Sequence, residues 1–273
     1  MNTSPGLAVA SAPDLAALTA ALGPLATAFG IRWVEECPST NSALLNEPPE
    51  SDGRAHVLVA TRQSAGRGRR GRQWLAWPGA SLTFSVLWRF APDAPAPAGL
   101  SLAVGVALAC ALEKLGLAAV TLKWPNDVLV HGAKLAGVLV EASPEHGRAL
   151  MAVIGIGLNL RLPADAVIPG QEGGAADLAS ELGEPPTREA LLAAILSELH
   201  PVLVTYASTG FGLLRNAWQQ RNAFANLPVR VSGEGQDLFG ICLGVDEEGV
   251  LLVRSNEGTH RVYAGDVSLR AAP

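Results

Sequence analysis

The chain has 273 residues, of which 49% are hydrophobic, enough for one large domain or for a medium-sized domain with a small appendix. Its formal net charge of -5 argues against a general nucleic-acid binder, which would carry a basic surface. The three cysteines, Cys37, Cys110 and Cys242, are odd in number and far apart. This spacing suggests neither a disulfide framework nor a CxxC metal site, and a reducing cytoplasm fits it.

The first thirty residues contain no Lys or Arg, so they lack the positive start of a secretory signal. Residues 14–29 could form one small apolar helix, but this stretch is too short for a winged helix-turn-helix module with its own core. We therefore expect a short N-terminal segment at residues 1–30 and no DNA-binding domain. The longest uncharged apolar stretch, residues 100–112, is shorter than the roughly 20 residues that cross a bilayer and predicts a buried helix.

From residue 31 onward, extended and helical patterns are mixed. Strands are expected at residues 56–63, 81–88, 121–130, 134–141 and 150–160, and helices after Ser39 and at residues 98–115, 188–206 and 211–224. Strands in runs with helices beside them predict an α+β fold with a substantial sheet. Residues 91–99, which are rich in proline, and residues 162–174 are expected to be loops.

After Leu227 the pattern changes to short β-like segments separated by turns that contain Gly and Glu. The segments are residues 229–231, 238–245, 250–254 and 261–263. They predict a small barrel, which can bury little alone and should therefore dock against the larger part of the chain. We expect one domain at residues 31–226 and a second at residues 227–273.

Residues 66–72 interleave glycine with four arginines, and Gln73 and Trp74 follow. Glycine lets the backbone approach a ligand, and arginine supplies planar donors for phosphate and carboxylate oxygens. Trp74 could stack on a base. The segment therefore predicts a mobile loop that orders when an anion binds. A loop that contacts RNA, or a merely solvated basic loop, explains the same composition.

Residues 123–127 read Lys-Trp-Pro-Asn-Asp, with Lys123 expected on a strand. Asn126 and Asp127 at the following turn could hold Mg²⁺, because hard cations prefer oxygen ligands. An ordinary strand-turn-strand hairpin with Asn-Asp at the bend accounts for these residues equally well.

Lys134 opens an otherwise apolar strand. At the mouth of a pocket it could neutralise a carboxylate or an α-phosphate, whereas at a strand end a lone lysine usually reaches into solvent. In residues 155–160, two glycines would allow close approach by a neighbour or a ligand, and Asn159 could bond a ligand or satisfy a local turn. Residues 39–42 suit the start of a helix, where capping alone explains them.

Five of these motifs together resemble bacterial biotin-protein ligases in both order and separation. They are STN at 39–41, Gln63 with GRGRRGRQW at 66–74, KWPND at 123–127, KLAGVLVE at 134–141 and GIGLNL at 155–160. The resemblance covers about residues 36–270, and the terminal barrel is similar to the SH3-like domain of that family. It implies a catalytic domain related to class II aminoacyl-tRNA synthetases. It also implies biotin and ATP as substrates, with Mg²⁺, and a carrier-domain lysine as acceptor.

The resemblance also implies residue roles. Biotin would be bound by Ser39, Thr40, Asn41, Gln63, Arg67, Gly68, Arg69, Lys134 and Gly137. ATP and the adenylate would be bound by Arg69, Arg70, Arg72, Trp74, Lys123, Asn126, Lys134 and Asn159. Lys134 and Arg69 would be catalytic, and Asn126 and Asp127 would hold the metal. The biotin carboxylate would attack the α-phosphorus of ATP, and a lysine amine would then attack the resulting biotinyl-5′-adenylate.

The bifunctional members of that family carry an N-terminal DNA-binding module. In this sequence only a short Ala-rich segment precedes the residues of the resemblance. We therefore expect a monofunctional, cytoplasmic ligase that binds neither DNA nor membrane and is compatible with a homodimer. Its partner would be the biotin carboxyl carrier domain of acetyl-CoA carboxylase or of another biotin-dependent carboxylase. Two alternatives are a lipoate or octanoyl ligase and a non-enzymatic RNA-binding or regulatory protein.

Overall fold

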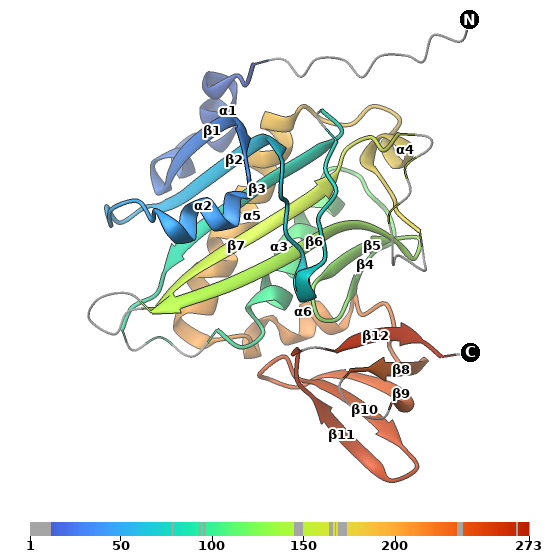
Figure 1. Cartoon of the computed structure of the whole chain (residues 1–273). Helices are drawn as coiled ribbons and strands as arrows, with labels where there is room; N and C mark the ends of the chain where they lie inside the picture. Colours follow the sequence, from blue (N-terminus) through green and yellow to red (C-terminus); the bar gives the residue numbers. More distant parts are fainter. Residues whose placement is uncertain are drawn as a thin grey trace, which may run out of the picture.

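The computed structural model consists of a large mixed sheet with helices packed against it and a second, C-terminal antiparallel sheet (Figure 1). It describes residues 12–272 except 78, 93, 95, 96, 145–149, 164, 165, 167, 169–173, 234–236 and 266. Residues 1–11 of the expected N-terminal segment and parts of the two expected loops therefore lie outside the described residues. The described parts of those loops contain no helix or strand.

The large sheet has seven strands in the order β1-β2-β3-β7-β6-β5-β4. Their bounds are β1 Phe29–Cys37, β2 Ala55–Gln63, β3 Ser81–Arg89, β4 Val120–Lys123, β5 Asp127–Val130, β6 Ala133–Pro144 and β7 Leu150–Asn159. β1 runs parallel to β2, and every other neighbouring pair is antiparallel. The mixed sheet with helices that the sequence predicted is thereby confirmed.

Two strand predictions need correction. Residues 121–130 are not one strand, because the chain reverses after Lys123 and pairs that residue with Asp127 in the β4–β5 hairpin. β1 was missed because buried and exposed positions do not alternate along it.

The helices are α1 Leu15–Leu22, α2 Thr40–Asn46, α3 Leu100–Lys114, α4 Leu178–Leu182, α5 Arg188–Thr209 and α6 Arg215–Gln219. α3 and α5 pack together and bury one face of the large sheet. α2 lies on the opposite face, where Leu44 packs with Leu58, Leu87 and Val153. β3 is buried along most of its length because it is covered on both sides.

The helices expected at residues 98–115 and 188–206 are confirmed as α3 and α5, but two others are wrong in extent. α1 stops at Gly23, which has a positive φ of 54°, and a 3-10 helix, Gly23–Ala28, follows it. The helix expected at residues 211–224 is a 3-10 turn, Gly212–Leu214, followed by the short α6. It ends before Asn222, whose side-chain oxygen accepts a hydrogen bond from the Phe224 N–H and so favours a turn.

By length and composition, α5 is apolar enough to cross a membrane. It contributes Leu192, Leu196, Leu199 and Leu203 to the core that it shares with α3 and α1. α5 is therefore buried in the way that a core helix is. A core helix and a membrane-spanning helix can have the same apolar composition.

The C-terminal sheet is antiparallel throughout, with the strand order β11-β10-β9-β8-β12. Its strands are β8 Pro228–Ser232, β9 Leu238–Val245, β10 Leu251–Ser255, β11 Gly258–Val262 and β12 Ser268–Ala271. Three of the expected segments match β8, β9 and β10. The fourth was placed a few residues too late, and β12 was not expected from its pattern.

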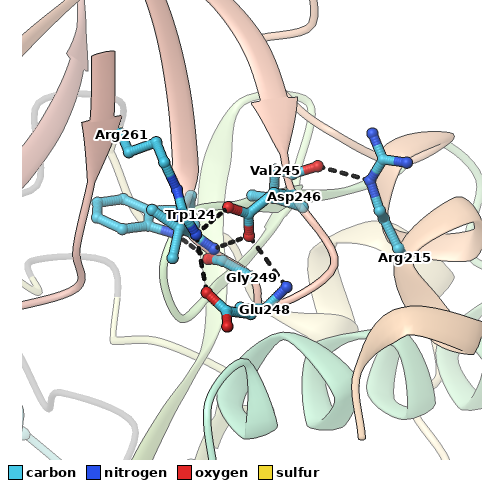
Figure 2. Close-up of polar contacts among 8 residues, drawn as sticks. Trp124, Arg215, Val245, Asp246, Glu248, Gly249 and Arg261 are labelled. Atoms are coloured by element: carbon cyan, nitrogen blue, oxygen red, sulfur yellow. Dashed lines mark hydrogen bonds and ion pairs between the residues drawn. The ribbon is translucent and has the colours of Figure 1, made fainter.

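The C-terminal sheet is joined to the larger sheet through the turn between β9 and β10 (Figure 2). The buried indole of Trp124 donates its Nε1–H to the carbonyl of Gly249 at 3.1 Å. Gly249 has a positive φ of 80°, and a Cβ there would lie 2.8 Å from the Cα of Gly99 at the start of α3. Arg215 also donates to the carbonyl of Val245 at 2.7 Å. This turn is therefore fitted into the larger part of the molecule.

We predict that Trp124→Phe lowers the free energy of unfolding by about 1–3 kcal/mol, because it leaves the buried Gly249 carbonyl without its donor. Urea unfolding followed by circular dichroism measures the change. Tyr263→Phe is the control, since that ring is 63% exposed and its substitution should change stability by less than about 0.5 kcal/mol. Equal stability of the Trp124→Phe protein and the parent would contradict the prediction.

Candidate functional site

A pocket of about 770 Å³ opens between the large sheet and the C-terminal sheet. Its lining includes the start of α2, the Gly-Arg loop at residues 66–74, the β4–β5 turn, the middle of β6 and β7, and residues of β12. All the residues to which the resemblance gives a binding or catalytic role line it. They are Ser39, Thr40, Asn41, Gln63, Arg67, Gly68, Arg69, Arg70, Arg72, Trp74, Lys123, Asn126, Asp127, Lys134, Gly137 and Asn159.

The floor of this pocket is a trough without side chains. Gly137 of β6 pairs directly with Gly157 of β7, so both strands lack a Cβ at the same level of the sheet. The indole of Trp74 lies in this trough, and a Cβ on Gly157 would come within 2.7 Å of its Nε1. A Cβ on Gly155 would come 2.9 Å from Cγ of Asn41. The glycines of GIGLNL thus allow close approach, as the sequence suggested.

One end of the pocket is a polar recess built around the start of α2. Ser39 caps this helix and accepts a hydrogen bond from the Ser42 N–H. The backbone N–H of Thr40 donates to Oε1 of Gln63 at 2.7 Å, and the Thr40 hydroxyl lies 2.7 Å from the hydroxyl of Ser85. Ser85 donates in turn to Oδ1 of Asn41. The recess is buried yet internally hydrogen-bonded, and it suits recognition of a neutral polar group.

The Gly-Arg loop folds back on itself beside this recess. Gly68 donates to the carbonyl of Arg72 at 2.8 Å, and Trp74 donates to the carbonyl of Gly66 at 3.0 Å. A Cβ on Gly66 would lie 2.6 Å from the carbonyl oxygen of Trp74, so the fold-back requires glycine at this position. Arg70, with a left-handed φ of 60°, and Arg72 are exposed at the tip.

Arg67 and Arg69 reach from this loop in different directions. Arg67 donates to the hydroxyl of Ser42 at 3.1 Å and forms an ion pair with Glu141 at 2.7 Å. Arg69 donates to Oδ1 of Asn126 at 3.3 Å and to the carbonyls of residues 264 and 265 at 2.9 and 2.8 Å. Arg69 therefore connects the loop to the C-terminal sheet.

Two lysines face the pocket, Lys134 from β6 and Lys123 from the edge strand β4. Lys134 forms an ion pair with Asp127 at 2.6 Å, and its Nζ lies 5.7 Å from the centre of the Trp74 ring. It does not extend into solvent, because its side chain is only 20% exposed. Lys123 lies over the ring of Phe224, with 5.8 Å between its Nζ and the ring centre. The pocket thus concentrates positive charge, which favours anionic ligands.

The oxygen ligands for a metal ion are few. No group of three or more His, Cys, Asp or Glu residues suited to a metal occurs among the residues that the structure describes. Asn126 donates through Nδ2 to the carbonyl of Val138 at 2.8 Å, while its Oδ1 accepts from Arg69. The Asp127 carboxylate lines the same pocket. One carboxylate and one amide fit Mg²⁺ that is carried mainly by substrate phosphates, since such ions take only one or two protein ligands.

Asn159 lies at the far end of β7 and is almost fully buried. Its Nδ2 donates to the carbonyl of Ala176 at 3.0 Å, whereas its Oδ1 has no hydrogen-bond partner among the described residues. A buried acceptor without a partner is costly unless another group fills the position. The atom can accept a hydrogen bond from an N–H group of a ligand.

Cys37 ends β1 near the polar recess, but it is not set up as a nucleophile. Burial raises the pKa of its thiol, and this effect outweighs the lowering by Arg32. The thiol is therefore protonated at neutral pH, and the nucleophilic form is the thiolate.

Four parts of the site received no role from the sequence: Ser85, Glu141, Phe224 and residues 267–271. Ser85 and Glu141 complete the polar recess, but they lie on strands whose patterns report only burial. Phe224 and residues 267–271 line the pocket from a turn and from the C-terminal sheet. Only the resemblance, which extends to about residue 270, pointed toward that part of the chain, because contacts between distant segments leave no local pattern.

Comparison with known proteins gives consistent matches over most of the chain. Residues 34–159 match the biotin/lipoate A/B protein ligase family, and residues 226–270 match the biotin protein ligase C-terminal domain. The biotin--[acetyl-CoA-carboxylase] ligase of Paracoccus denitrificans is 36% identical over 84% of this chain and 96% of its own length. The bifunctional ligase/repressor BirA of Escherichia coli is 36% identical over 86% of this chain and 72% of its own length. The solved biotin protein ligase of Aquifex aeolicus, in complex with biotin and ATP, superposes with a TM-score of 0.76 at 29% identity. It covers 89% of this chain and 99% of its own length.

We predict that Gly157→Ala displaces the indole of Trp74 from the glycine trough, because the added Cβ would overlap the ring. The protein labelled with 5-fluorotryptophan measures this by ¹⁹F NMR, with the Trp74 signal assigned from Trp74→Phe. Gly212→Ala is the control, since a Cβ at that position meets nothing within 4 Å. A Trp74 signal that does not move in Gly157→Ala would contradict the described packing.

Proposed function

The chain belongs to the biotin/lipoate A/B protein ligase family, and from that membership we propose how its pocket works as an ATP-dependent biotin-protein ligase. The enzyme forms biotinyl-5′-adenylate from biotin and ATP and then transfers biotin to a protein lysine. The observation that carries the proposal is that one pocket combines a neutral polar recess with a cluster of cationic side chains. Biotin has a neutral ureido head and a carboxylate tail, and ATP supplies the second anion.

Biotin is bound with its head in the recess formed by Ser39, Thr40, Asn41 and Gln63. Its acyl chain then runs along the trough over Gly137 and Gly157 toward Lys134. The indole of Trp74 lies in that trough. We propose that this ring moves aside when biotin enters and afterwards, with Asn159, holds the adenosine. The Oδ1 of Asn159 that lacks a partner supports the second role, because the adenine amino group is an N–H donor.

Catalysis is mainly positioning and charge stabilisation. The biotin carboxylate oxygen attacks the α-phosphorus, the bond to the bridging oxygen breaks, and pyrophosphate leaves. Lys134 and Arg69 neutralise the oxygens that crowd together as this bond forms. The Arg67–Arg69 part of the loop, with Gly68 between, closes over the acyl chain and the phosphate, and Arg70 and Arg72 lie toward the nucleotide. A lysine amine of the carrier then attacks the mixed anhydride, and AMP leaves.

Lys123, Asn126 and Asp127 serve the triphosphate end of the pocket. Mg²⁺ bound there supplies charge neutralisation for the leaving pyrophosphate. Asp127 is the better ligand of the pair, because the amide oxygen of Asn126 already accepts from Arg69. With Lys134 paired to the substrate carboxylate, Asp127 and Asn126 would hold the metal.

We propose a division at residues 31–226 and 227–273, with residues 1–30 as an N-terminal segment. The larger unit would be a class II aminoacyl-tRNA synthetase-like domain and the smaller one an SH3-like barrel. The family match at residues 226–270 supports the second boundary.

Proteins of this type act on the carriers of biotin-dependent carboxylases. We propose the biotin carboxyl carrier domain of acetyl-CoA carboxylase, or of another such enzyme, as the partner in the cytoplasm. The proposed activity is compatible with a homodimer and needs no DNA.

Incubation of the purified protein with Mg²⁺ and ATP tests the activity. We expect pyrophosphate release only when biotin is also present, and a gain of mass on a candidate carrier domain that equals one biotinyl group. Lipoate in place of biotin should give neither. Release with lipoate alone would support the lipoate ligase alternative, and binding of RNA without any release would support the non-enzymatic one.

We predict that Arg69→Ala releases biotinyl-5′-adenylate into solution about tenfold faster than the parent, since one or two charged hydrogen bonds are lost from the closed loop. Filtration of the complex with labelled biotin measures the release rate. Arg62→Ala is the matched control, because Arg62 makes an exposed ion pair with Glu36 outside the pocket. An unchanged release rate in Arg69→Ala would remove this residue from its proposed role.

A further inference from the structure

Glu141 lies on β6 at the rim of the polar recess and holds two functional side chains at once. Its Oε2 accepts a hydrogen bond from Nδ2 of Asn41 at 2.9 Å. Its Oε1 accepts from the guanidinium of Arg67 at 2.7 Å. The first partner belongs to the recess and the second to the Gly-Arg loop, and these segments are distant in sequence.

The contact with Asn41 determines which way its amide faces. Nδ2 points at two groups that can only accept, the carboxylate of Glu141 and the carbonyl of Leu139 at 3.2 Å. Its Oδ1 must therefore face Ser85, whose hydroxyl donates to it.

The orientation of the Asn41 amide in turn determines which atom donates in the next hydrogen bonds of the recess. Because the single hydroxyl hydrogen of Ser85 is used by Asn41, the Ser85 oxygen is the acceptor in its contact with Thr40 at 2.7 Å. Oε1 of Gln63 accepts from the backbone N–H of Thr40, which leaves the Gln63 amino group on the other side of that amide. The Glu141 carboxylate thus sets the pattern of donors and acceptors through Asn41, Ser85 and Thr40, while the backbone N–H of Thr40 orients Gln63.

The contact with Arg67 fixes the first arginine of the loop. Its guanidinium is placed between Glu141 and the hydroxyl of Ser42, so both α2 and β6 restrain it. Hydrogen bonds between charged groups are stronger than neutral ones and lose less to solvent when partly buried. The side chain of Glu141 is 24% exposed, which meets that condition.

We propose that Glu141 is a positioning residue of this ligase, which orients the recess for the biotin head and anchors the Gly-Arg loop through one carboxylate. The role in biotin binding rests on the proposed function, whereas the anchoring of the loop does not. Two partners that both donate require two acceptors. Glutamine offers only one, because its Nε2 would face the Nδ2 of Asn41 or the guanidinium of Arg67.

The test compares Glu141→Gln with Glu198→Gln in the full chain. Glu198 makes an ion pair with Lys114 at 2.6 Å and has a side-chain exposure of 23%, so it matches Glu141 in burial and charge but lies on α5, away from the pocket. Trypsin cleavage within residues 67–72 of the ligand-free protein reports the anchoring of the loop. Calorimetric titration with biotin, and separately with ATP and Mg²⁺, measures whether the recess still binds biotin and whether any loss is specific to biotin.

For Glu141→Gln we expect faster cleavage in the loop and about tenfold weaker biotin binding, as the loss of one charged hydrogen bond implies, with ATP affinity within about twofold of the parent. Glu198→Gln should match the parent in all three measurements. Glu141→Asp keeps both acceptors and should restore part of the biotin affinity, which a general loss of stability would not allow.

Parental cleavage rates and parental biotin affinity in Glu141→Gln would overturn the proposal. Equal losses of biotin and ATP affinity, without rescue by Glu141→Asp, would also overturn it, because they indicate a structural role alone. If the parent itself bound no biotin, the proposed function would fail, while the cleavage rates would still decide whether Glu141 anchors the loop.

Discussion

Lys134 and Asp127 form a 2.6 Å ion pair on neighbouring strands in the middle of the pocket, and the other cations are arranged around it. Arg67 is matched by Glu141, and Arg69 by carbonyl oxygens and the amide of Asn126. Without these acceptors, the positive groups would repel one another in a partly buried site. The cations are therefore held on protein groups, and we propose that substrate carboxylate and phosphate oxygens replace those groups.

This arrangement makes the C-terminal sheet part of the site. Trp124 lies between Lys123 and the Asn-Asp turn in sequence, and its indole is bonded to the β9–β10 turn of the C-terminal sheet. Arg69 reaches the connection between β11 and β12. The loop and the phosphate end of the pocket are thus both connected to the same small sheet. A shift of that sheet would move the Gly-Arg loop and the Lys123–Asp127 segment together, and under the proposed roles small displacements of these groups would affect the rate.

Much of the site was predictable because each motif has a local physical reason. Alternating glycine and arginine predicts a loop for anions, Ser-Thr-Asn predicts a helix start, and two glycines in an apolar strand predict close approach. All of these segments line one pocket.

Periodicity also predicted α3, α5 and most strands. It failed for β1, which has no regular alternation, and for α6, where the side chain of Asn222 favours a turn over a continued helix. Ser85 and Glu141 were missed because their importance depends on Asn41, which is 44 and 100 residues away in sequence.

The glycine trough and the polar recess depend on each other through the register of three strands. Gly155 of β7 pairs with Ser85 of β3 on one side and with Leu139 of β6 on the other. Asn41 fits against this level of the sheet because Gly155 has no side chain, and there it reaches Ser85, Leu139 and Glu141. One level along the strands, Gly157 pairs with Gly137 and leaves room for Trp74. A shift of register by one residue would turn both glycines to the other face. We propose that the same pairing sets where the polar head of biotin ends and where its apolar chain begins.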